Sequence, residues 1–187
     1  QAASAHAWSL SIAAASRRVF LHVGNGTLNA DNGTVNLVSA NLTGAQLLSG
    51  APQAMVSNST QANSLYGDNY ATCPTPASQI MVGASYCRSS ATNGPASATL
   101  RVTSPANLVS AAGDTIPFSQ ISWTVSAPGS GAPNVIPAGT FSGAAQTLTT
   151  VPANTYIENC HSFIYANSAV RAAGTYTGQV TYTLTSP

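Results

Sequence analysis

Charged residues are scarce in this chain of 187 residues. They make up 5% of the sequence, against about 25% in an average protein, and lysine is absent. Because no basic stripe is present to release phosphate counterions, this composition argues against nucleic-acid binding. The absence of lysine also excludes the Lys–Asn isopeptide cross-links that reinforce sortase-assembled pilins. With a formal net charge of +1, the surface has little electrostatic repulsion between molecules, which favours association.

Long apolar runs are also missing. No run of 18 apolar residues occurs, so no membrane-spanning helix is predicted. No signal peptide is visible, and Gln1 followed by small residues is typical of a mature N-terminus after cleavage. We therefore expect a secreted protein.

Cysteines are few. Cys73, Cys87 and Cys160 allow one intrachain disulfide and leave one cysteine over, and their spacing fits no zinc site. The pair Cys73–Cys87 closes the shortest loop and is the favoured prediction. Cys160 paired with either of the other two is the alternative.

Recognisable catalytic patterns are absent from the sequence. It contains no Glu-x-x-His, no Gly-x-Ser-x-Gly and no closely spaced pair of carboxylates. Asp114 and His161 could meet in space beside one of many serines, but structural roles are favoured for both. We expect a protein that is not an enzyme and that needs no metal or cofactor.

The most regular pattern lies in residues 174–185, where apolar and polar residues alternate strictly. One face carries Tyr176, Gly178, Val180, Tyr182 and Leu184, and the other is mostly threonine. This alternation predicts a strand that is buried on one face. Only Ser186 and Pro187 follow, so we expect another segment to cover the outer edge of this strand, since an open edge invites aggregation.

A second alternating stretch lies near the N-terminus. Trp8, Leu10 and Ile12 recur at period two, which predicts an extended strand, although the alanine content also allows a helix. The small residues at 13–16 would form a flexible joint. We therefore expect an N-terminal arm, residues 1–16, ahead of one domain, residues 17–187. An ordinary first strand folded back on its own domain is the alternative.

Many short strands are predicted between these two stretches, with turn signals every 8 to 12 residues. The clearest lie at 18–23, 34–39, 79–87, 97–102, 121–125 and 161–165, and Asn-Gly pairs at 25–26 and 32–33 suggest hairpin turns. No long helical period is present, and residues 44–78 should form loops and short strands. The fold class is therefore predicted as an all-β antiparallel sandwich.

The order of these features over residues 97–187 resembles that of chaperone–usher fimbrial subunits, particularly the alternate or archaic and spore-coat-U-like branches. The resemblance rests on Ala98-Thr99-Leu100-Arg101-Val102, on Ile116-Pro117-Phe118 with Ile121-Ser122-Trp123, and above all on Ala173-Gly174-Thr175-Tyr176-Thr177-Gly178 leading into the last strand. It implies an immunoglobulin-like sandwich that lacks its seventh strand. In that family the N-terminal arm of the next subunit fills the gap.

On this resemblance we expect a structural subunit of an extracellular, cell-surface filament that polymerises by donor-strand exchange, for adhesion or biofilm formation. The donor face would be Trp8, Leu10 and Ile12, and the acceptor groove would be lined by Tyr176, Val180, Tyr182 and Leu184. The implied partners are identical subunits in a homopolymer, with a periplasmic chaperone and an outer-membrane usher during export.

A different function class is a self-contained secreted β-sandwich that binds carbohydrate or another surface. The pair Tyr66 and Tyr70 supports it, because tyrosine rings stack on sugars, although structural packing of both is favoured. The first third of the chain also holds four Asn-x-Ser/Thr sequons, which makes them candidate glycan sites: Asn25, Asn32, Asn41 and Asn58.

Overall fold

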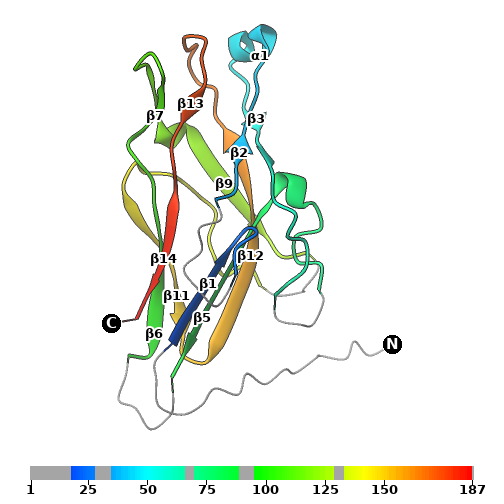
Figure 1. The fold of residues 1–187 in the computed structure, drawn as a ribbon, viewed down its shortest axis with the longest axis vertical. Helices are drawn as coiled ribbons and strands as arrows, with labels where there is room; N and C mark the ends of the chain where they lie inside the picture. Colours follow the sequence, from blue (N-terminus) through cyan, green and yellow to red (C-terminus); the bar gives the residue numbers. More distant parts are fainter. Residues whose placement is uncertain (1–17, 28–34, 66–69, 89–94, 129–132, 187) are drawn as a thin grey trace.

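Two antiparallel sheets face each other across one apolar core (Figure 1). The structure is a computed structural model, and it describes residues 18–27, 35–65, 70–88, 95–128 and 133–186. The larger sheet has the order β1 (Arg18–Val23), β5 (Ile80–Cys87), β12 (Thr155–Tyr165), β9 (Ile121–Ser126) and β10 (Gly139–Thr140), and the short β3 (Gln53–Ala54) also pairs with β12. The smaller sheet has the order β11 (Ala145–Pro152), β6 (Ser97–Thr103) and β14 (Thr181–Thr185). The predicted all-β sandwich is confirmed.

The core lies between these sheets and follows the alternation of their strands. In β6, Ala98, Leu100 and Val102 are buried while the residues between them are more exposed, because successive side chains point to opposite faces. Rings fill the centre: the Phe141 ring lies 4.8 Å from that of Trp123 and 5.3 Å from that of Phe118, centroid to centroid.

Six of the strands follow the order of an immunoglobulin-type sandwich, while β11 adds a strand on the other side of β6. Numbered along the chain, β1, β5, β12 and β9 take the positions of strands A, B, E and D in the first sheet, and β6 and β14 take those of C and F in the second. In that architecture a seventh strand, G, pairs with the free side of F. No described strand pairs with that side of β14.

A third, smaller sheet lies at one end of the molecule. It consists of β13 (Tyr176–Thr177), β7 (Asn107–Ser110) and β8 (Thr115–Pro117), followed by the short helix η2 (Phe118–Gln120). We call this end, which also carries the helix α1 (Gly44–Ser49), the tip; the C-terminus lies toward the other end (Figure 1). Below α1, β2 (Val38–Ser39) pairs with β4 (Val56–Ser57), and η1 (Pro76–Ser78) precedes β5.

The strand predicted over residues 174–185 is broken in the structure. The chain pairs with β7 at β13, leaves the ladder at 178–180 and pairs with β6 only from Thr181. Gly178 marks the break, because a Cβ at this position would lie 2.7 Å from the Phe118 ring. The segment therefore crosses from one sheet to another where a side chain has no room.

The predictions for turns, short strands and loops were only partly correct. The Asn-Gly pair at 25–26 follows β1 but joins no hairpin, because β1 pairs with β5 and β2 pairs with β4. Of the strand predicted at 34–39, the described residues 35–39 form only the two-residue β2. The predicted loops and short strands of the middle region are present, and α1 begins there at a capping box formed by Thr43 and Gln46, a pattern that the sequence contains.

Candidate functional site

Two sheet edges meet without a hydrogen-bonded ladder between them. β14 is bonded to β6, and β1 is bonded to β5, yet β1 and β14 lie next to each other. Within the described ranges, neither strand pairs on its other side. We call these two neighbouring strands, residues 18–23 and 181–185, the β1–β14 seam.

Apolar side chains along the seam are only partly covered. Leu184 is 9% exposed and belongs to the core, whereas Tyr182 and the preceding Val180 are half-buried against it. On β1, Leu21 is half-buried and Val19 is 41% exposed. On the opposite face of β14, the three threonines are exposed to solvent. The seam thus presents an incomplete apolar face beside unpaired backbone.

Of the four predicted acceptor residues, Tyr182 and Leu184 lie in the seam and Val180 immediately precedes it. Tyr176 does not lie there, because the break at Gly178 places it in β13 at the tip. Its hydroxyl donates a hydrogen bond to the Ala172 carbonyl oxygen at 2.8 Å.

The predicted donor residues Trp8, Leu10 and Ile12 lie outside the described residues, as does the whole arm 1–16. Their role stays a prediction. The first described strand begins at Arg18, one residue after the predicted start of the domain.

A polar pair lies beneath the seam. The Tyr182 hydroxyl lies 3.3 Å from Nδ1 of His161, and the His161 ring lies parallel to that of Trp123, with centroids 6.3 Å apart. Burial lowers the pKa of the His161 imidazole to about 3 and raises the pKa of the Tyr182 hydroxyl. Both side chains are therefore neutral near pH 7, and among the described residues the buried imidazole Nε2 has no hydrogen-bond partner.

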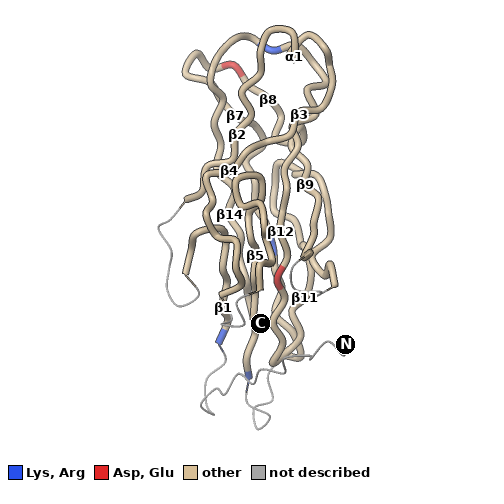
Figure 2. Tube along the Cα trace, turned by 90° about the vertical axis from the view of Figure 1, so that its right-hand side faces the viewer, with Lys and Arg blue, Asp and Glu red and all other residues tan. Residues whose placement is uncertain are grey.

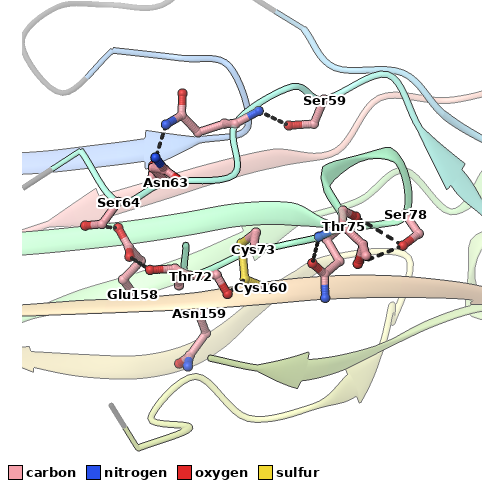
Figure 3. The surroundings of a disulfide bond; sticks show 12 residues. Ser59, Asn63, Ser64, Thr72, Cys73, Thr75, Ser78, Glu158, Asn159 and Cys160 are labelled. Atoms are coloured by element: carbon pink, nitrogen blue, oxygen red, sulfur yellow. Dashed lines mark hydrogen bonds between the residues drawn. A yellow bond between two sulfur atoms is a disulfide. The ribbon is translucent and has the colours of Figure 1, made fainter. Parts of the chain in front are cut away.

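The disulfide joins Cys73 to Cys160 (Figure 3), so the favoured pairing Cys73–Cys87 is wrong and the alternative through Cys160 is confirmed. Cys87 is free and buried. The register explains the difference: Cys160 lies opposite Met81, whereas Cys87 lies at the far end of β5, opposite Arg18. A short separation along the chain did not bring the two sulfurs together.

Beside the disulfide, a buried carboxylate accepts three hydroxyl hydrogen bonds. The Glu158 carboxylate accepts from Thr72 Oγ1 at 2.6 Å and from Ser64 Oγ at 3.1 Å (Figure 3), and it also accepts from the Tyr156 hydroxyl. Opposite Glu158, Gly83 leaves room for the Tyr156 hydroxyl, because a Cβ there would collide with it.

Glu158 and the disulfide hold one segment, residues 58–65 and 70–79, over the outer face of the larger sheet. We call it the covering segment. It covers β5 at Met81, which packs against the disulfide, and all eight residues of β5 are buried. Glu158 was not among the predicted residues, although the alternation of β12 places Tyr156, Glu158 and Cys160 on one face.

The candidate glycan sites differ in their surroundings. The Asn25 Nδ2 donates to Thr60 Oγ1 at 3.0 Å and its Oδ1 accepts from the Thr60 backbone nitrogen at 2.9 Å, so this asparagine joins two loops. The Asn58 Oδ1 also accepts two hydrogen bonds. Asn41 is exposed, and Asn32 lies outside the described residues. Glycosylation stays a prediction for all four.

The other candidates do not assemble into a site. Tyr70 is half-buried and its carbonyl oxygen accepts from the Ser64 and Thr72 nitrogens, while Tyr66 is not described. Asp114 lies in the exposed turn between β7 and β8, and His161 lies in the core. Among the described residues, no group of three or more His, Cys, Asp or Glu side chains could hold a metal ion. None of the described helices is long and apolar enough to cross a membrane.

No protein-family model matches the chain, and no curated protein or solved structure matches it significantly.

Proposed function

We propose that the chain is a structural subunit of an extracellular filament, and that neighbouring copies join by exchange of a strand. The β1–β14 seam carries this proposal. At the seam, two adjacent strand edges have no hydrogen-bonded ladder between them. The apolar side chains there are only partly covered by the described residues. An edge of this kind is a template for an added strand, whose main chain supplies hydrogen bonds and whose alternate side chains supply specificity.

The strand order supports the same reading. β14 holds the position of strand F, because it pairs with β6 in the position of strand C. A strand from another copy, in the position of G, would complete the second sheet. It would also cover Val180 and Tyr182, which are half-buried in the single chain.

The arm at residues 1–16 is the candidate donor. Trp8, Leu10 and Ile12 recur at period two and so share one face of an extended strand. Each large apolar side chain contributes about 2 kcal/mol when it is buried. Since β1 and β14 contact each other, insertion would have to separate them, and two new ladders would replace that contact.

Composition supports assembly outside the cell. A chain with 5% charged residues offers little repulsion between copies, and a buried disulfide is compatible with an oxidising compartment. The filament would be a homopolymer that serves adhesion or biofilm formation. A chaperone and an usher during export are the partners that the fimbrial resemblance implies.

Removal of the donor arm tests the proposal. The full chain should form filaments in electron micrographs and a ladder on a gel run in hot detergent, because each subunit is locked to the next. A chain without residues 1–14 should form neither. Adding a synthetic peptide of residues 5–14 should raise the melting temperature of the truncated chain without restoring filaments.

A peptide of the same composition in scrambled order is the matched control, and it should not change the melting temperature. The proposal fails if the truncated chain is as stable as the full chain and indifferent to the peptide. It also fails if the full chain remains a monomer whose arm occupies its own seam.

A further inference from the structure

A polar cup opens at the tip of the molecule. Its volume is about 420 Å³. It is built where the β7–β8 turn meets the segment that leads into β13, and its lining is Gly113, Asp114, Thr115, Val170, Arg171, Ala172 and Tyr176. None of these residues belongs to the β1–β14 seam.

Hydrogen bonds to the backbone hold the walls of the cup. Ser110 exchanges bonds with the turn: its nitrogen donates to the Asp114 carbonyl oxygen at 2.9 Å, and its Oγ accepts from the Asp114 nitrogen at 3.1 Å. Tyr176 pairs with Ser110 across the β7–β13 ladder, and its hydroxyl holds the Ala172 carbonyl on the other wall. The cup is therefore preformed.

Two opposite charges line the cup without neutralising each other. Charged positions are sparse along the chain (Figure 2), yet one of its four acids and one of its five arginines meet here. No ion pair or hydrogen bond joins the Asp114 carboxylate or the Arg171 guanidinium to another described side chain. Within the described part of the chain, Arg171 Nε is buried with no hydrogen-bond partner.

A buried donor without a partner is costly, and native structures rarely leave one unless an unseen group supplies the acceptor. A guanidinium bonds best to an anionic oxygen pair, through two parallel N–H groups. The Asp114 carboxylate accepts hydrogen bonds only, so it suits hydroxyl groups on the same ligand. The half-buried Tyr176 also lines the cup.

We infer that the tip cup binds an acidic sugar, such as a uronic acid unit of a surface polysaccharide. Its carboxylate would bond Arg171, its hydroxyl groups would donate to Asp114, and its ring would lie against Tyr176. The cup uses no residue of the donor arm or of the β1–β14 seam. Sugar binding at the cup can therefore be tested independently of filament assembly.

The test is a separate titration of the full chain with glucuronic acid, with glucose and with acetate, each monitored by isothermal calorimetry and by NMR. Glucuronic acid should bind at least about tenfold more tightly than either of the others. Glucose lacks the charge-assisted bond to Arg171, acetate lacks the charge-assisted bonds to Asp114, and one such bond is worth about that factor. Its binding should shift the signals of Val170 and Tyr176. Arg171→Gln and Asp114→Asn should each weaken binding about tenfold or more.

Arg101→Gln is the matched control, since Arg101 is an exposed arginine on β6, away from the tip; it should bind like the unaltered chain. Neither cup variant removes a hydrogen bond that holds the fold, so both should melt at the unaltered temperature. Equal affinity for glucose overturns acid recognition, and equal affinity for acetate overturns sugar recognition. Absence of binding, or no effect of Arg171→Gln, overturns the site itself.

Discussion

The Tyr182 hydroxyl lies 3.3 Å from Nδ1 of His161, so one polar contact joins the β1–β14 seam to the centre of the core. The imidazole is enclosed by rings: Trp123 lies parallel to it and Phe163 lies tilted against it. A neutral histidine fits this setting, and a charged one does not. The acid and alkaline limits of stability should therefore both be set partly by this pair.

Lowering the pH should destabilise the chain through His161. Burial lowers the pKa of its imidazole from the ordinary 6.5 to about 3. Between pH 6.5 and pH 3 the imidazole is therefore protonated in the unfolded chain and neutral in the folded chain. The free energy of unfolding should fall as the pH falls from 6.5 toward 3, by about 5 kcal/mol at most. Urea unfolding at pH 7 and pH 4 measures this. The variant His161→Gln should show a shallower fall, and an unchanged slope in that variant would contradict the assignment.

Raising the pH should destabilise the chain through Tyr182. Burial raises the pKa of its hydroxyl above 10.0, so above pH 10 the unfolded chain loses this proton first and is favoured. Tyr182→Phe keeps the ring and removes the ionisation. At pH 7 this variant should be about 1 kcal/mol less stable, because Nδ1 of His161 loses its partner. Above about pH 10 the difference should shrink or reverse, as thermal melts at the two pH values would reveal.

Breaking the disulfide should release the covering segment. Cys73 and Cys160 are 87 residues apart, and a cross-link over a loop of this length stabilises by about 4 kcal/mol. Cys160→Ser should lower the free energy of unfolding by that order. Cys87→Ser, which alters a buried cysteine outside the bond, is the control and should cost less. A larger loss for Cys87→Ser would contradict the observed pairing.

Glu158→Gln should loosen the same segment without breaking a covalent bond. An amide accepts through one oxygen only, so at least one of the three hydroxyl groups would lose its acceptor, at a cost of about 1–3 kcal/mol. Hydrogen exchange should accelerate in residues 70–79. Asp114→Asn, at an exposed carboxylate, is the matched control and should change neither stability nor exchange.

Val19→Asn should weaken assembly more than folding. Val19 is 41% exposed at the seam, so a polar side chain there should change the stability of the single chain by less than about 1 kcal/mol. An inserted strand would bury this position, and the polar group should then reduce the yield of hot-detergent ladders. Val35→Asn, at a valine that is 66% exposed outside the seam, is the control. Equal yields from both variants would argue against the seam as the acceptor.

The local pattern of the sequence determined most of the strands. The strand-forming run at residues 18–23, stopped by Gly24, predicted β1 with the bounds that the structure has, and alternation located β6 and β9 to within a residue. It also assigned Val180, Tyr182 and Leu184 to one buried face. These successes share a cause: the pleat of a strand repeats every two residues, so a side chain's face can be read from its neighbours.

Only the tertiary structure decided which distant residues meet. In it Cys160 is bonded to Cys73, and Glu158 accepts hydrogen bonds from hydroxyl groups of the covering segment. Tyr176 lies at the tip with Arg171 and Asp114, away from the seam. Each outcome depends on the register between strands and on the room available at positions such as Gly178. Register and free volume are properties of packed elements, and a period of two residues carries no information about them.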